Sequence, residues 1–345
     1  MTTRSDLASR STVTRAVVLT RRPQGQFTAA DLGLAEFPLA EVHKGQALVR
    51  NIYMSIDPST RGRMDATEKQ YTTNFEIGGP LDGSALGIVE ESATPLLPVG
   101  SVVRHRLGWR ERAVVDADVV RVVDLDLAPA PAWLGALGQT GFTAWVGLTK
   151  IGQLAPGDAV LVSGAGGGVG SIAGQLARLL GASQVIGTAG GPEKCAWLTD
   201  DMGYNVAIDY RAGDISERLA AAAPDGVDLF FDNVGGQQLV AALHHMKIDA
   251  RIALCGMMSN FGVAEQPSMS HLIEAVLRRT TLRGFIVRDH EASRDEFEKR
   301  VANWLSTGEL VDRASIVDGL ENAPAALEGL LAGANFGKGL VRVGD

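Results

Sequence analysis

A glycine-rich turn carries the clearest chemical signal in the sequence. Residues 161–170 begin as an apolar strand, pass through five glycines and run into residues 171–180, which have the composition of a helix. In such a turn, backbone N–H groups face an anion at the positive end of the helix dipole. Glycine is needed because a larger side chain would keep a pyrophosphate away from the backbone. We predict a phosphate-binding loop, although such turns can also serve only close packing of strand and helix. Its residues are Gly164, Ala165, Gly167, Gly168, Val169 and Gly170.

The residues that follow the loop favour NADP(H) over NAD(H). The glycines are spaced G-x-x-G-x-x-G, not G-x-G-x-x-G, and no carboxylate ends the strand expected at 185–188, where NAD-binding proteins usually carry one. Lys194 lies one turn into the next helix and suits a 2′-phosphate, and Gly190 leaves room for that group. Tyr210 could close the same pocket. Alternatively, Lys194 is a solvated helix residue and Tyr210 a half-buried surface aromatic.

Composition limits the classes of protein to which the chain could belong. Its 345 residues are enough for two domains, and 46% hydrophobic with 21% charged residues is ordinary for a globular protein. A net charge of −8 without a long basic cluster argues against nucleic acid as a partner. Cys195 and Cys255 lie far apart, no apolar run approaches the roughly 20 residues of a membrane span, and the start of the chain lacks a secretory signal. We expect a cytoplasmic protein with no membrane partner.

Two patterns of elements follow one another along the chain. Residues 15–125 hold short β-type runs separated by Gly and Pro, which predicts a small barrel-like β domain. From residue 159, strands alternate with helices, with strands expected at 159–163, 184–188, 206–209, 227–232, 250–255 and 281–287. This alternation predicts an α/β fold with a parallel doubly wound sheet. A strand at 340–343 is too small to stand alone and needs a partner sheet, which we expect in the N-terminal domain.

Several motifs together resemble one known family over nearly the whole chain. They are Met54-Ser-Ile-Asp-Pro58, Arg61-Gly-Arg-Met64, Thr188-Ala-Gly-Gly-Pro-Glu-Lys-Cys195, Ala207-Ile-Asp-Tyr210, Phe230-Phe-Asp-Asn-Val-Gly-Gly236, Ala250-Arg-Ile-Ala-Leu-Cys-Gly256, Glu321-Asn-Ala-Pro-Ala325 and Asn335-Phe-Gly-Lys338. In this order they resemble the zinc-independent medium-chain dehydrogenase/reductases. The most similar group within that family is the prostaglandin/leukotriene reductases, plant double-bond reductases and bacterial curcumin-type reductases.

The resemblance implies a Rossmann fold inserted in a GroES-like β-barrel domain. Residues 1–136 and 313–345 would form the GroES-like substrate domain, and residues 137–312 the NADPH-binding domain. It also implies reduction of a carbon–carbon double bond conjugated to a carbonyl, a small enal or enone as substrate, and a homodimer. Lys194 and Tyr210 would meet the 2′-phosphate, and Phe285, Ile286 and Val287 would run beside the nicotinamide. Further cofactor contacts would come from Thr143, Asn233, Cys255, Gly256 and Asn335.

The implied reaction also needs a proton donor, and here the sequence departs from the family. Hydride attack on the β-carbon leaves an enolate, which needs hydrogen-bond donors and a proton at the α-carbon. Relatives are thought to use the nicotinamide ribose hydroxyl and a tyrosine, where this chain carries Phe261. Ser259 or Asn260 could donate instead, or the cofactor hydroxyl and water could suffice. Of the tyrosines in the substrate domain, Tyr53 and Tyr71, the first is the better candidate, although either could be a packing aromatic.

Other departures concern the pocket and zinc. Ser59-Thr60 and Gln139-Thr140 stand where relatives often carry Tyr-Met and Met-Pro, which should alter the substrate pocket. Zinc-dependent relatives need a Gly-His-Glu element and a four-cysteine lobe, and this chain has neither, so we predict no metal. No tyrosine has a lysine four residues on, which excludes a short-chain dehydrogenase. A zinc-free quinone reductase and a non-catalytic NADPH-binding protein remain as alternatives.

Overall fold

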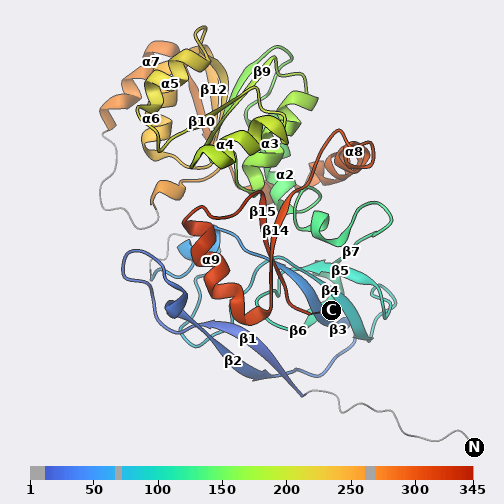
Figure 1. Cartoon of the computed structure of the whole chain (residues 1–345). Coiled ribbons are helices and arrows are strands. Elements are labelled where there is room, and N and C mark those ends of the chain that lie inside the picture. Colours follow the sequence, from blue (N-terminus) through green and yellow to red (C-terminus); the bar gives the residue numbers. More distant parts are fainter. Residues whose placement is uncertain (1–11, 67–71, 261–268, 345) are drawn as a thin grey trace, which may run out of the picture.

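The chain folds into an α/β body and a β-rich body that meet along one side of each (Figure 1). The structure is a computed structural model, and it describes residues 12–66, 72–260 and 269–344. Phe261 and Tyr71 lie outside these ranges.

A six-stranded, all-parallel sheet forms the centre of the α/β body. Its order is β10 (Val206–Asp209), β9 (Gln184–Ala189), β8 (Ala159–Val162), β11 (Val227–Asp232), β12 (Met246–Leu254) and β13 (Thr281–Gly284). The helices that alternate with these strands are α3 (Gly168–Leu179), α4 (Pro192–Asp200), α5 (Ile215–Ala222), α6 (Gly236–His245) and α7 (Ile273–Arg278). The predicted Rossmann sheet is confirmed. Its strand order reverses between β8 and β11, and ligands of such sheets bind at the carboxyl ends of the strands beside that point.

Several predicted element boundaries differ from the structure. Strand β12 begins at Met246 instead of residue 250, and β15 spans Lys338–Arg342 instead of 340–343. Helix α3 begins at Gly168 instead of residue 171, because Gly167 takes the N-cap position and its carbonyl accepts from the Ser171 amide at 2.9 Å. The last strand stops at Gly284 instead of residue 287. Strand β13 pairs only with β12, which ends at Leu254 opposite Gly284, so residues beyond that point have no ladder to extend.

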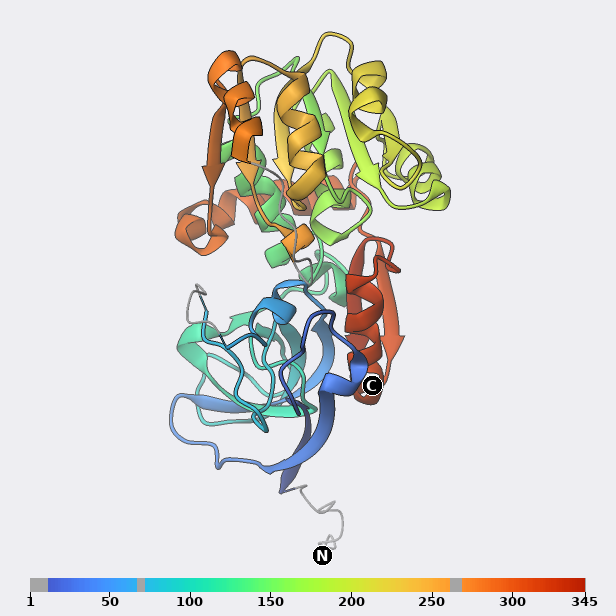
Figure 2. The same cartoon turned by 90° about the vertical axis from the view of Figure 1, so that its left-hand side faces the viewer.

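The β-rich body is a GroES-like domain completed by the C-terminal end of the chain. Strand β3 (Gln46–Ser55) pairs antiparallel with β4 (Ala85–Ser92), β6 (Arg112–Asp116) and β15 (Lys338–Arg342). Strand β14 (Ala314–Asp318) joins β15, while β5 (Val102–His105) and β7 (Arg121–Val122) extend the other end of the sheet. Figure 2 shows β14, β15 and α9 (Ala323–Leu331), in red, against the N-terminal elements. The predicted partner sheet for the C-terminal strand is therefore confirmed.

The remaining elements complete this body and the junction. They are β1 (Val13–Leu19), β2 (Leu32–Pro38), α1 (Ser59–Gly62), α2 (Gln139–Val146) and α8 (Arg294–Ser306). Short 3-10 turns lie between them, and a π-helical turn, Gly147–Ile151, follows α2. Strands β1 and β2 form a separate two-stranded antiparallel sheet. The domain boundaries at 136/137 and 312/313 stay predictions.

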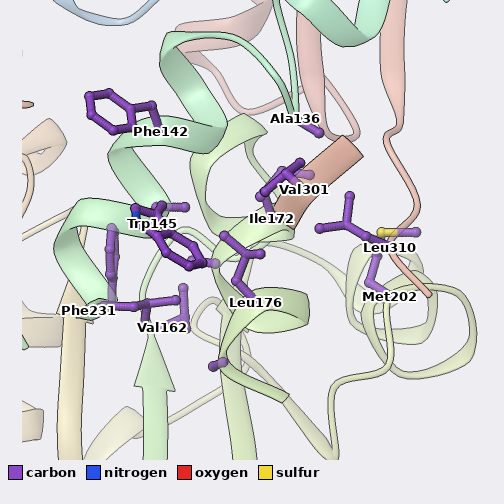
Figure 3. Close-up of a cluster of buried hydrophobic side chains, with 14 of the residues drawn as sticks. Ala136, Phe142, Trp145, Val162, Ile172, Leu176, Met202, Phe231, Val301 and Leu310 are labelled. Atoms are coloured by element: carbon purple, nitrogen blue, oxygen red, sulfur yellow. The ribbon is translucent and has the colours of Figure 1, made fainter. Parts of the chain in front are cut away.

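A buried cluster holds α3 in place. Trp145 of α2, Ile172 and Leu176 of α3, and Phe231 of β11 are almost completely buried in it (Figure 3). Burial of each such side chain stabilises the fold by about 1.5–3 kcal/mol. Because the glycine-rich loop leads into α3, this cluster also fixes where the loop stands.

The chain passes between the two bodies near Ala136 and again near Asp312, and these two segments contact each other. Gln175 of α3 binds the backbone of Val311 twice, accepting from its amide at 2.8 Å and donating to its carbonyl at 2.9 Å. Next to it, the Asp312 carboxylate accepts from the Ala136 amide at 3.2 Å. Burial raises the pKa of Asp312 to about 6. Helix α3, which follows the glycine-rich loop, is thus tied directly to the segment that precedes Asp312.

Candidate functional site

A cleft of about 450 Å³ lies where the two bodies meet, at the carboxyl ends of the parallel strands. Most of the predicted cofactor residues line it: Thr143, Gly164, Gly167, Gly168, Val169, Gly170, Asn233, Cys255, Gly256, Phe285, Ile286, Val287 and Asn335. A second hollow of similar size lies at the amino ends of β11 and β12, the wrong end of the sheet for a nucleotide.

The glycine loop has the shape that a pyrophosphate requires. Gly164 has a φ of +58°, a conformation that side chains other than glycine rarely adopt. A Cβ at Gly170 would lie 2.4 Å from the Gly164 carbonyl oxygen, so this turn has no room for one. The first N–H groups of α3, which no helical carbonyl can reach, open at the cleft. Ala165 lies behind the loop instead, fully buried, with its amide bonded to the Thr188 carbonyl at 2.9 Å.

A cluster of cationic and aromatic side chains surrounds Gly190 at the end of β9. A Cβ at Gly190 would lie 2.9 Å from Arg211 Cζ and 3.0 Å from the Tyr210 hydroxyl. Lys194 passes the glycine loop, and its ammonium donates to the Gly333 carbonyl at 2.7 Å. Burial, and then the charge of Arg211, lower the pKa of Lys194. An anion placed between the two cations would relieve their repulsion, as a 2′-phosphate would.

Arg211 was missed by the sequence analysis. Its position directly after Tyr210 was the available signal, but only the fold shows that both side chains turn toward Gly190. Asp209 holds this corner together, because its carboxylate accepts from the amides of Gly191 at 2.9 Å and Arg211 at 3.0 Å.

A buried network orients Asn233 at the end of β11. Asp232 Oδ1 accepts from the Ser163 hydroxyl at 2.6 Å and from the amides of Val234 and Gly235, both at 2.9 Å. Asn233 Nδ2 donates to the Ser163 carbonyl at 2.7 Å, so its Oδ1 is left as an acceptor at the wall of the cleft. Burial raises the pKa of Asp232. Ser163 and Asp232 were also missed, although Asp232 lies inside one of the family motifs.

The residues predicted to lie beside the nicotinamide include no charged side chain. Burial, and then the charge of Asp232, raise the pKa of the Cys255 thiol to about 12, so the thiol stays neutral. Phe285 and Val287 pack against the main hydrophobic cluster. Thr143 donates its hydroxyl hydrogen to the Gln139 carbonyl at 2.8 Å. These residues offer an apolar wall with one hydroxyl oxygen on it.

An ion pair across the two ends of the chain forms part of the opposite wall. Lys338 donates to Asp57 Oδ1 at 2.6 Å and to the Ile56 carbonyl at 3.0 Å, and the Ser55 hydroxyl donates to Asp57 Oδ2 at 2.6 Å. Burial alone would raise the pKa of Asp57, but Lys338 and Ser55 hold it below its ordinary value. Both charged residues belong to family motifs, yet the sequence analysis gave them no role.

Two of the three predicted proton donors, Tyr53 and Ser259, do not line this cleft. Tyr53 does not line it, since the residue sits half-buried in β3 opposite Arg342, whose guanidinium lies 5.9 Å from the ring centre. Ser259 also lies off the cleft wall: its hydroxyl is buried against the start of α6 and has no hydrogen-bond partner among the described residues. Asn260 ends a described segment, and its side chain is not described. Met257 and Met258, just before these residues, do line the cleft.

The described residues hold no group of three His, Cys, Asp or Glu side chains that could bind a metal ion. Within the same ranges, no helix combines the length and apolar character that crossing a membrane requires.

The fold and the cleft together define a dinucleotide-dependent oxidoreductase of the medium-chain type. A family model described as the N-terminal domain of oxidoreductase matches residues 15–123, and one described as zinc-binding dehydrogenase matches residues 168–307. The chain belongs to the medium-chain dehydrogenase/reductase superfamily, in the group of NADP-dependent curcumin, alkenal and prostaglandin reductases.

Individual relatives match over almost their full length. The putative NADP-dependent oxidoreductase YfmJ of Bacillus subtilis is 40% identical over 95% of this chain and 97% of its own. The NADPH-dependent curcumin reductase of Escherichia coli is 39% identical over 95% and 96%. The crystal structure of CurA from Vibrio vulnificus in complex with NADPH superposes with a TM-score of 0.90, at 36% identity over 96% of this chain and 99% of that one.

Proposed function

We propose that this protein uses NADPH to reduce the carbon–carbon double bond of α,β-unsaturated aldehydes and ketones. The observation that carries the proposal is the glycine loop and the Lys194–Tyr210–Arg211 cluster beside one interdomain cleft. The relatives named for curcumin and alkenal reduction support the substrate class.

We propose that the chain binds the cofactor at three points. The loop around Gly167 would hold the pyrophosphate, Lys194 and Arg211 the 2′-phosphate, and Asn233 Oδ1 a hydroxyl or amide donor of the cofactor. The apolar surface of Phe285–Val287 would lie against the nicotinamide and exclude water. When bound, NADPH would supply the hydride for the β-carbon of the substrate.

The enolate then needs a proton, and the described side chains favour water as its source. Tyr53 and the Ser259 hydroxyl lie off the cleft wall. We therefore propose that this chain holds the substrate for protonation by water or a cofactor hydroxyl. Hydrogen-bond donors on the wall of the cleft would stabilise the negative charge on the enolate oxygen until the α-carbon is protonated.

The experiment is NADPH oxidation with a panel of alkenals, cyclic enones and quinones, repeated with NADH. Turnover of the alkenals and enones to saturated carbonyls supports the proposal. Turnover of quinones alone would favour the quinone-reductase alternative. Binding of NADPH without turnover of any compound would favour the non-catalytic alternative.

We also propose a cytoplasmic homodimer. Both cysteines are free thiols, as expected in a reducing compartment. Strand β13 is an edge of the parallel sheet, and α7 beside it exposes Ile273, Val276 and Leu277 by 55%, 69% and 59%. An apolar surface next to a sheet edge suits a second copy of the chain.

A further inference from the structure

The turn that follows α9 belongs to the GroES-like body but is fastened to the α/β body. Residues 332–337, which we call the α9 turn, lead from α9 into β15 at the junction of the two bodies (Figure 1). The Gly337 amide donates to the Gly166 carbonyl of the glycine loop at 3.0 Å. The Phe336 ring packs edge-on against Trp197 of α4, with the ring centres 5.5 Å apart. The α9 turn therefore contacts the glycine loop and α4 at once.

Both cations of the proposed 2′-phosphate site donate to the α9 turn. The Lys194 ammonium donates to the Gly333 carbonyl at 2.7 Å. Arg211 Nη2 makes a longer contact with the Ala332 carbonyl, at 3.4 Å. These carbonyls stand at the C-terminal end of α9, where the helix dipole is negative and cations are favoured. The α9 turn thus helps to fix where the two cations point, although it belongs to the other body.

Each cation keeps donors for a phosphate while it holds the α9 turn. A lysine ammonium has three N–H donors and an arginine guanidinium has five. Each contact with the turn uses one donor, so the same cation can hydrogen-bond a phosphate at the same time. A 2′-phosphate bound by Lys194 and Arg211 would then be linked through them to the GroES-like body.

Gly333 stands where a side chain would meet one of these cations. Its φ is +76°, a conformation that favours glycine. Beyond its chain neighbours, the only heavy atom of the described residues within 4 Å of a Cβ built there is Arg211 Nη2, at 3.7 Å. A small side chain therefore fits sterically at this position, and a polar group on it would reach Arg211 first.

We propose that the α9 turn completes the 2′-phosphate site and that Gly333 is a specificity-determining residue for NADPH over NADH. The carbonyls of the turn position Lys194 and Arg211, and the missing side chain at Gly333 leaves both cations to the phosphate. As a consequence, NADPH holds the two bodies together more firmly than NADH does. The inference rests on the proposed roles of Lys194 and Arg211 and adds a contribution of the GroES-like body to the choice of cofactor.

The first test compares cofactor binding by three variants with that by the wild type. The Kd values for NADPH and NADH are measured by titration of the fluorescence of the reduced nicotinamide, without substrate, for Gly333→Asp, Gly333→Asn and Gly308→Asp. Asn has the shape of Asp without its charge, and both tolerate a left-handed φ better than most side chains do. Gly308 is exposed in the turn after α8 and has a φ of +74°, so it controls for a carboxylate at such a glycine elsewhere.

We expect Gly333→Asp to raise the Kd for NADPH about tenfold to a hundredfold, because its carboxylate pairs with Arg211 and repels the 2′-phosphate. The Kd for NADH should change far less, and added salt should weaken the effect. Gly333→Asn and Gly308→Asp should keep the ratio of the two Kd values within about threefold of the wild type. Equal losses in Gly333→Asp and Gly333→Asn, or equal losses for both cofactors, would overturn the inference.

Hydrogen exchange of the wild type tests the same inference without a substitution. Exchange is followed with saturating NADPH and with saturating NADH, in peptides that cover the α9 turn and in peptides of α8 as the control. NADPH should slow exchange in the α9 turn more than NADH does, because the Gly337 amide is bonded across the junction, and α8 should show no such difference. Equal or faster exchange of the α9 turn with NADPH would overturn the inference.

Neither measurement requires turnover, so a failure of the proposed reaction is recognised separately. If the wild type binds NADPH and NADH equally, Lys194 and Arg211 do not hold a 2′-phosphate and the inference falls with that assignment. A protein that shows the expected effects on cofactor binding but reduces no enal or enone supports the inference and contradicts the proposed reaction.

Discussion

At the scale of single residues, we propose that Lys194 and Arg211 decide which cofactor binds. Lys194→Ala and Arg211→Ala should each raise the KM for NADPH about tenfold to a hundredfold, because each removes a charged contact worth about 1.5–3 kcal/mol. The KM for NADH should change far less, since NADH lacks the 2′-phosphate.

Steady-state kinetics with both cofactors check this expectation, with the exposed Lys299→Ala of α8 as the control for loss of one positive charge. An equal rise of the two KM values would mean that Lys194 and Arg211 support the fold of the corner rather than the phosphate.

A variant of Ser259 tests whether the loop after β12 has a structural or a catalytic role. Its hydroxyl is buried, has no partner in the described ranges and lies off the cleft, so Ser259→Ala should lower kcat by less than about threefold. Removing an unsatisfied buried hydroxyl should leave the melting temperature equal or slightly higher. A hundredfold loss of kcat at unchanged KM would instead make Ser259 the proton donor.

At the scale of elements, the linker at Asp312 makes stability depend on pH. Burial raises the pKa of this carboxyl from 3.8 to about 6, so the folded state holds the proton more tightly than the unfolded chain. The stabilising contribution is complete below about pH 4 and is lost as the pH rises through 6.

Asp312→Asn should remove this dependence. Between pH 4 and pH 7, the free energy of unfolding of the variant should rise relative to that of the wild type by up to about 2 kcal/mol. This is less than the full pKa shift corresponds to, because Asp312 is partly accessible to solvent. Urea denaturation across this range measures the difference. A difference that is constant with pH would contradict the assignment to Asp312.

The helices and strands also show which parts of the fold could be predicted from the sequence. Local patterns predicted the glycine loop, the alternation of the Rossmann sheet and the need of the C-terminal strand for a partner, because spacing along the chain fixes each of them. The strand beyond Gly284 was wrongly extended, because the end of a strand depends on its neighbour β12.

Four of the residues that were missed share one physical reason. Asp57 meets Lys338 from the other end of the chain, and Ser163 meets Asp232 across two strands. Such pairs are made by topology, and no spacing in the sequence brings their partners together.

At the scale of the whole molecule, the outward face of α7 predicts an association of two copies. Val276→Glu should give a monomer at concentrations where the wild type is a dimer, since a carboxylate would have to be buried at the interface. Light scattering measures the mass. The matched control is Val119→Glu, because Val119 is equally exposed, at 74% against 69%, and belongs to the GroES-like body.

A monomeric wild type would contradict the homodimer. A dimer that persists in Val276→Glu would place the interface elsewhere on the molecule.

The overall arrangement places the glycine loop on one side of a cleft and a polar, basic wall on the other. We propose that this arrangement serves conjugate reduction. The most direct test follows deuteride from NADPH labelled at the transferring carbon into an enal. We predict a saturated aldehyde with one deuterium at the β-carbon, and an α-hydrogen that comes from solvent. Deuterium at the carbonyl carbon of an allylic alcohol would contradict the account.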